Sequence, residues 1–210
     1  MTSLARTERD ALCTLALDLG ADAPTLSGGW TVKDLVVHLL VREGSPAAVG
    51  IVVPPLSGLT DLASARLARQ DLATLVRRLR QGPPLWSPFR LGPLDKALNT
   101  LEFYVHHEDV RRAQDGWAPR NLDARAQEAL WRTIRVAGKG LTRSAPVGVV
   151  LERTDTSERA ALKDTTPAVV VRGLPSELVL FVYGRKPQAR VDLEGDDAAV
   201  AALTGADLGI

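Results

Sequence analysis

The sequence predicts an α+β protein, in which an N-terminal antiparallel helical bundle is followed by a small C-terminal α/β domain. Through about residue 145, apolar residues recur at helical spacing, and loops rich in Pro and Gly separate the helical segments. After Ala145, runs rich in β-branched residues replace that pattern. We therefore expect two domains, at residues 1–145 and 146–210.

Five helices are expected in the N-terminal part. An apolar stripe runs from Leu4 to Leu19 and ends at Gly20. The second helix should run from Thr31 to about Arg42, because Thr31 is followed three residues later by Asp34, close to a capping box. The remaining helices are expected at residues 59–80, 93–113 and 123–141, and the 59–80 helix should end at Gly82-Pro83-Pro84.

The C-terminal part mixes short strands and helices. Strands are expected at residues 147–151, 168–171 and 189–193, where Val, Leu and Ala dominate. Short helices are expected at residues 176–183 and 196–203, the second opened by acidic residues that suit a helix N-terminus. This arrangement predicts an α/β unit.

Composition narrows the functional class. With 26 Lys and Arg against 25 Asp and Glu, the chain lacks the basic excess of a nucleic-acid binder. No apolar run is long or uninterrupted enough for a signal peptide or a membrane span. The single cysteine, Cys13, excludes an internal disulfide and fits a reducing compartment. We expect a cytoplasmic protein, monomeric or homodimeric, that binds neither nucleic acid nor membrane.

The chemistry predicted for this chain depends on its three histidines. Glu102 and His106 are four residues apart on the fourth helix, so both side chains can reach one metal ion. An ion pair on a solvated face is the alternative for these two residues. His38 lies in the apolar run Val36–Val41, where a hydrogen-bonded core histidine is the alternative. Together the three residues predict a metal site with an open position, as in catalytic zinc centres.

Neighbouring residues are assigned supporting roles. Asp109 lies one turn after His106 and is expected to hold the distal nitrogen of that imidazole, with an ion pair to Arg111 or Arg112 as the alternative. His107 points about 100° away from His106 on a helix, so we expect it to be partly exposed or to support the ligands indirectly. Cys13 has no histidine nearby in sequence and is expected to be inert. No side chain is assigned as a nucleophile.

Several segments resemble a known family. Residues 27–39, SGGWTVKDLVVHL, resemble the GWT-x-x-D-L-x-x-H-L segment of DinB-like metal-binding bundles, and more specifically that of the mycothiol-dependent maleylpyruvate isomerase family. Residues 99–109, NTLEFYVHHED, are similar to the second signature of that family, Glu-x3-His followed by Asp. Residues 172–178, 181–185 and 191–203 resemble its C-terminal segments, so the resemblance spans nearly the whole chain in the same order.

The resemblance implies a function and a ligand set. His38, Glu102 and His106 match the family's ligands to a divalent metal, usually zinc, and mycothiol is the implied cosubstrate. The implied activity is isomerisation or thiol transfer on a small electrophilic substrate, although the chain looks most like a subgroup known mainly as a metal-binding protein. Arg112 and Arg185, and more weakly Arg90, are candidates to bind anionic groups of the substrate or thiol, and a structural or solvated role is the alternative for Arg112 and Arg185. A non-catalytic, metal-stabilised binding module and a hydrolase using metal-bound water are the alternatives.

Overall fold

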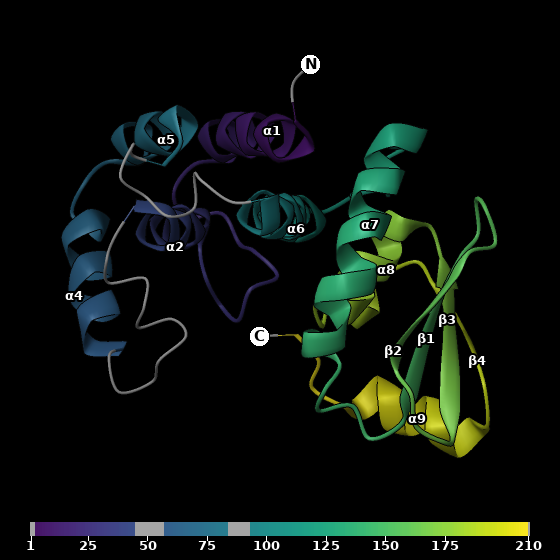
Figure 1. Cartoon of the computed structure of the whole chain (residues 1–210). Helices are drawn as coiled ribbons and strands as arrows, with labels where there is room; N and C mark the ends of the chain where they lie inside the picture. Colours follow the sequence, from purple (N-terminus) through teal and green to yellow (C-terminus); the bar gives the residue numbers. More distant parts are fainter. Residues whose placement is uncertain (1–2, 45–56, 84–92, 210) are drawn as a thin grey trace. The chain divides into compact units, whose positions relative to one another are not determined.

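The computed structural model describes residues 3–44, 57–83 and 93–209 (Figure 1). The chain divides into two compact units, residues 1–118 and 119–210. The described part of the first unit is helical apart from an isolated bridge between Pro24 and Thr31, and the second holds a sheet with helices, which confirms the α+β fold class. The division precedes residue 145 because the helix of residues 124–141 packs with the sheet. The domain boundary expected at residue 145 stays a prediction.

The first unit contains α1 (Leu4–Leu19), α2 (Val32–Gly44), α4 (Ser57–Ala68), α5 (Leu72–Gln81) and α6 (Pro93–Arg112). Helix α1 contacts α5 and α6, and α2 contacts α4 and α5 (Figure 1). Their facing sides bury a largely aliphatic core, which includes Leu12, Leu35, Leu39, Leu79 and Phe103. Burial of these side chains removes apolar area from water and is the main force that holds the helices together.

The start of α2 confirms the predicted capping box. The backbone N–H of Thr31 donates to Asp34 Oδ2 at 3.0 Å, and the Asp34 N–H donates to Thr31 Oγ1 at 3.2 Å. These bonds satisfy backbone donors that have no partner within the helix. The first turn of α2 is thereby set, and with it the direction in which His38 projects two turns later.

The prediction of a single helix over residues 59–80 is wrong, because the chain forms two helices there. Helix α4 ends at Ala68 and α5 begins at Leu72. Asp71 interrupts the helical run, since its backbone is extended and its carboxylate accepts a hydrogen bond from the Thr74 N–H at 2.9 Å. An aspartate at this position stabilises a helix start more than a helix interior.

The second unit contains α7 (Ala124–Leu141), β1 (Gly148–Arg153), β2 (Arg159–Lys163), β3 (Ala168–Gly173), α8 (Pro175–Val182), the 3-10 turn η4 (Lys186–Gln188), β4 (Asp192–Glu194) and α9 (Asp197–Gly205). The strand order is β2-β1-β3-β4. Strands β1 and β3 are parallel, whereas β2 pairs antiparallel with β1 and β4 antiparallel with β3. Helices α7 and α8 contact each other, α7 also contacts β2, and α8 contacts β1 and β3 (Figure 1).

Strand β2 was not predicted, and β4 begins later than the expected run of residues 189–193. In β2 only Leu162 is buried, and charged residues stand at both ends, because this strand lies at the sheet edge. An edge strand lacks the apolar run by which buried strands are identified in sequence. No helix in the described ranges combines the length and hydropathy that a bilayer span requires.

Candidate metal centre

The structure brings His38, Glu102 and His106 together across α2 and α6. One ligand atom from each side chain lies within 4.8 Å of the other two. His106 Nε2 is 3.5 Å from Glu102 Oε2, and the ring centroids of His38 and His106 are 5.4 Å apart. His38 thus lies beside Glu102 and His106, which follow it by 64 and 68 positions along the chain, as the sequence predicted.

Helix α6 positions two of these side chains because apolar neighbours anchor it. Leu101, Phe103 and Val105 are buried, while the four-residue spacing places Glu102 and His106 on one face. His106 is 8% exposed, and His38 and Glu102 are half-buried. The cluster therefore lies at the margin of the core.

Asp109 contacts the distal nitrogen of His106, as expected. Its Oδ2 lies 3.1 Å from His106 Nδ1 and accepts a hydrogen bond from Ser27 Oγ at 2.8 Å. Asp109 is fully buried, so the contact is protected from water. A proton held on Nδ1 leaves Nε2, the nitrogen that faces Glu102, as the electron-pair donor. Arg111 and Arg112, the alternative partners, both donate to Glu108, at 2.9 and 2.5 Å.

The electrostatics of the cluster suit ligands for a cation. Burial, aided by His106, lowers the pKa of His38 to about 4, so this imidazole is neutral near pH 7. Burial alone would raise the pKa of Glu102, but the hydrogen bond with His106 and the charge of Arg42 lower it to about 2. These are the protonation states that metal binding requires of the two residues. Although burial opposes it, hydrogen bonds to Asp109 and Glu102 raise the pKa of His106, so its imidazole must release a proton from Nε2 to bind a metal.

One ligand pair of the cluster has a separation close to that of a tetrahedral zinc site, and all three ligand atoms lie within 4.8 Å of one another. Zinc–nitrogen and zinc–oxygen bonds of about 2.0–2.1 Å place tetrahedral ligand atoms roughly 3.3 Å apart. The 3.5 Å separation of His106 Nε2 and Glu102 Oε2 is close to that value. Two imidazoles and one carboxylate leave a fourth position for water or a substrate atom.

The other residues singled out from the sequence have different surroundings. Arg112 is 3% exposed, donates Nε to Glu108 and stacks on Trp117 with its guanidinium carbon 4.7 Å from the ring centroid. Arg185 belongs to the second unit and donates to the carbonyl oxygen of Tyr183 at 2.6 Å. Arg90 lies outside the described residues.

His107 and Cys13 are both buried. His107 is 5% exposed, so the expected partial exposure is wrong, and its Nδ1 lies 2.8 Å from Glu8 Oε2. It thereby belongs to the contact of α6 with α1. Cys13 is fully buried, and burial raises the pKa of its thiol to about 11, which agrees with an inert residue.

Two residues at the site were missed in the sequence. Arg42 Nε lies 3.4 Å from Glu102 Oε2, and Trp30 places its ring centroid 5.0 Å from that of His38. The signal for Arg42 was its position four residues after His38, which puts both on one face of α2. Trp30 is 38% exposed and forms part of the rim of the cluster.

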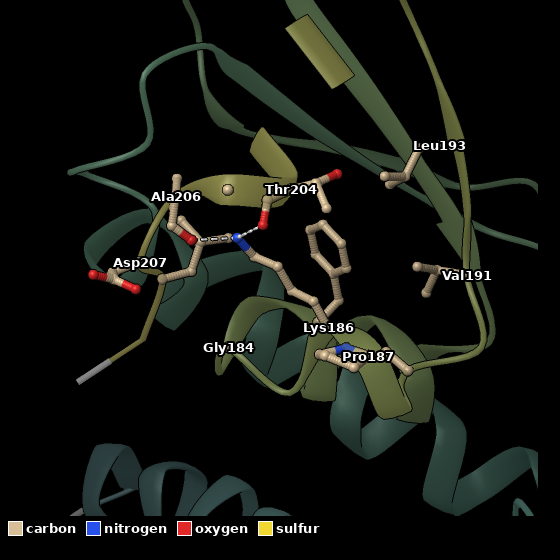
Figure 2. Close-up of a pocket in the computed structure, with 12 residues that line it drawn as sticks. Gly184, Lys186, Pro187, Val191, Leu193, Thr204, Ala206 and Asp207 are labelled. Atoms are coloured by element: carbon tan, nitrogen blue, oxygen red, sulfur yellow. Dashed lines mark hydrogen bonds between the residues drawn. The ribbon is translucent and has the colours of Figure 1, made fainter. Parts of the chain in front are cut away.

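A cavity of about 540 Å³ lies in the second unit (Figure 2). None of the triad residues, His38, Glu102 and His106, lines it. Apolar side chains, among them Phe181, Val191 and Leu193, form part of its wall. The ammonium group of Lys186 donates to the carbonyl oxygens of Leu203 at 2.6 Å and Thr204 at 3.2 Å, where α9 ends. Lys186 therefore caps the C-terminal end of α9. The titratable side chains that converge as in a reactive site are His38, Glu102 and His106.

Two solved structures are similar to this chain. One is a crystal structure of the mycothiol-dependent maleylpyruvate isomerase, with a TM-score of 0.59 and 18% sequence identity over 92% of this chain and 91% of the other. The second is a histidine-to-alanine mutant of that isomerase, with a TM-score of 0.60 and the same identity and coverage. No protein-family model and no curated protein sequence matches the chain. At this identity the similarity shows a shared fold.

Proposed function

We propose that this protein is a metal-dependent enzyme of the mycothiol-dependent type, acting as an isomerase or thiol transferase on a small electrophilic substrate. The observation that carries the proposal is the open three-ligand cluster of His38, Glu102 and His106, whose ligand atoms lie within 4.8 Å of one another. The fold shared with the maleylpyruvate isomerase supports the thiol as cosubstrate. The single cysteine supports a cytoplasmic location.

Each residue of the cluster and its surroundings would have a distinct role at the metal site. His38, Glu102 and His106 would hold a divalent metal, and zinc is the metal that best suits this donor set. Asp109, fixed by Ser27, would retain the proton on His106 Nδ1 and so direct Nε2 toward the metal. A metal held by these residues would lower the pKa of a coordinated thiol and so would supply thiolate at neutral pH. Arg112 remains a proposed contact for anionic groups of the thiol or substrate, and Arg185 remains a proposed anion-binding residue of the second unit.

Metal content tests the ligand assignment. The purified protein should contain about one divalent metal per chain, and His38→Ala, Glu102→Ala and His106→Ala should each lose most of it, because two ligands bind a metal far more weakly than three. His107→Gln is the matched control, since it changes the adjacent histidine on the same helix and should keep the metal. Full metal content in all three ligand variants would refute the site.

Thiol binding tests the reaction class. Cobalt substituted for the native metal gives a visible spectrum that depends on its ligands, so added mycothiol should change that spectrum in the wild-type protein. An unchanged spectrum, with cobalt bound, would contradict the thiol enzyme and favour the binding module or the hydrolase. Turnover of the metal-loaded protein with mycothiol and a cis-unsaturated keto acid would then separate an enzyme from a binding module.

A further inference from the structure

Arg42 borders the proposed metal centre on the side of Glu102. Its Nε is 3.4 Å from Glu102 Oε2, the same oxygen that lies 3.5 Å from His106 Nε2. A second nitrogen of the guanidinium donates to Asn99 Oδ1 at 2.7 Å. Asn99 and Glu102 lie one turn apart on α6, so Arg42 reaches from α2 to two successive positions on the facing helix.

The charge of this arrangement changes when Glu102 becomes a metal ligand. Without metal, the Glu102 carboxylate is paired with Arg42. One carboxylate cannot neutralise both a divalent cation and a guanidinium. When His38 and His106 are neutral, a divalent metal and Arg42 together carry three positive charges, and Glu102 and Asp109 together carry two negative charges. One positive charge is therefore not neutralised. The side chains of Arg42 and Glu102 are only 12% and 14% exposed, so water compensates that excess poorly.

The geometry of Arg42 suits one kind of anion. A planar guanidinium matches the two oxygens of a carboxylate, and the bond to Asn99 holds its plane in a defined orientation. The neighbouring carboxylate on α2, Glu43, is paired with Arg9. Arg42 therefore faces the ligand cluster, and a carboxylate on a molecule bound at the open metal position would lie within its range.

We propose that Arg42 binds a carboxylate of the molecule that occupies the open metal position, so that the site selects anionic over neutral ligands. This inference rests on the metal centre of the proposed function and adds a specificity residue to it. A purely structural role, in which Arg42 only joins α2 to α6, predicts no such selection.

Paired ligands that differ only in charge provide the test. Cobalt-substituted protein is titrated with 3-mercaptopropionate and its amide, and separately with succinate and succinamate, and the visible spectrum reports binding. In the wild-type protein the carboxylate of each pair should bind about tenfold more tightly than the amide, as expected for a charge-assisted hydrogen bond. Arg42→Gln should abolish this preference, and Arg42→Lys should restore part of it.

The controls separate selection from folding. Arg77→Gln removes an exposed arginine of α5 and should keep the full preference. Where Arg42→Gln does not fold or hold cobalt, Arg42→Met is read instead, and circular dichroism verifies the helices of each variant. Equal affinities within the pairs in the wild-type protein, or a preference retained in the neutral variants, would overturn the role of Arg42.

The two pairs also distinguish the failure of this inference from that of the proposed function. If neither thiol binds but succinate is preferred over succinamate only when Arg42 is present, the thiol function is wrong and the role of Arg42 stands. If both thiols bind equally, the thiol function stands and the role of Arg42 is wrong.

Discussion

Asp109→Asn removes one charge from the most buried part of the site while keeping the shape of the side chain. Asp109 is fully buried and contacts His106 Nδ1 at 3.1 Å. The asparagine amide keeps the volume but loses the charge-assisted hydrogen bond, which contributes about 1.5–3 kcal/mol. Removing such a support of a metal-binding histidine lowers metal affinity about 10- to 100-fold, which corresponds to about 1.4–2.7 kcal/mol.

Zinc affinity near neutral pH, measured by competition with a chelating indicator, provides the assay. Ser27→Ala is the matched control, because it removes only the 2.8 Å hydrogen bond to Asp109 Oδ2 and leaves the charge in place. That variant should lose affinity only a few-fold. Wild-type zinc affinity in a folded Asp109→Asn protein would show that the carboxylate does not orient His106.

Three further predictions concern stability. Asp71→Ala removes the cap of α5 and should lower the free energy of unfolding by about 1 kcal/mol in urea titrations, whereas Asp71→Ser should retain most of it. Gly148→Ala should prevent β1 from pairing normally, because the added Cβ would lie 2.0 Å from the Thr165 carbonyl oxygen; retained wild-type thermal stability would contradict this packing. The raised pKa of Cys13, about 11 against 9.0, means that its contribution to stability is complete below pH 9 and is lost as pH rises toward 11. Cys13→Ala should therefore weaken the decline in stability over that range by about 2 kcal/mol in denaturation at successive pH values, and an unchanged decline would be the contrary result.

Much of the helical part follows from short-range patterns. The capping box of Thr31 and Asp34 places the start of α2, and the four-residue spacing of Glu102 and His106 places both on one face of α6. Such patterns can be recognised in a sequence because a helix repeats every 3.6 residues and each contact joins residues close together along the chain. The break at Asp71 was missed because an apolar stripe continues across it, and only the local hydrogen bond to Thr74 ends the helix.

The amino-acid sequence by itself determined the α+β class, the helices that carry the triad, and the residue types able to bind a metal. Tertiary structure alone decided which side chains from distant segments meet. It brought the Ser27 hydroxyl into a hydrogen bond with Asp109, 82 residues away, and Arg42 into an ion pair with Glu102. It also paired the edge strand β2 with β1. The physical reason is that periodicity encodes the face on which a residue lies, whereas its partner depends on how whole helices and strands pack.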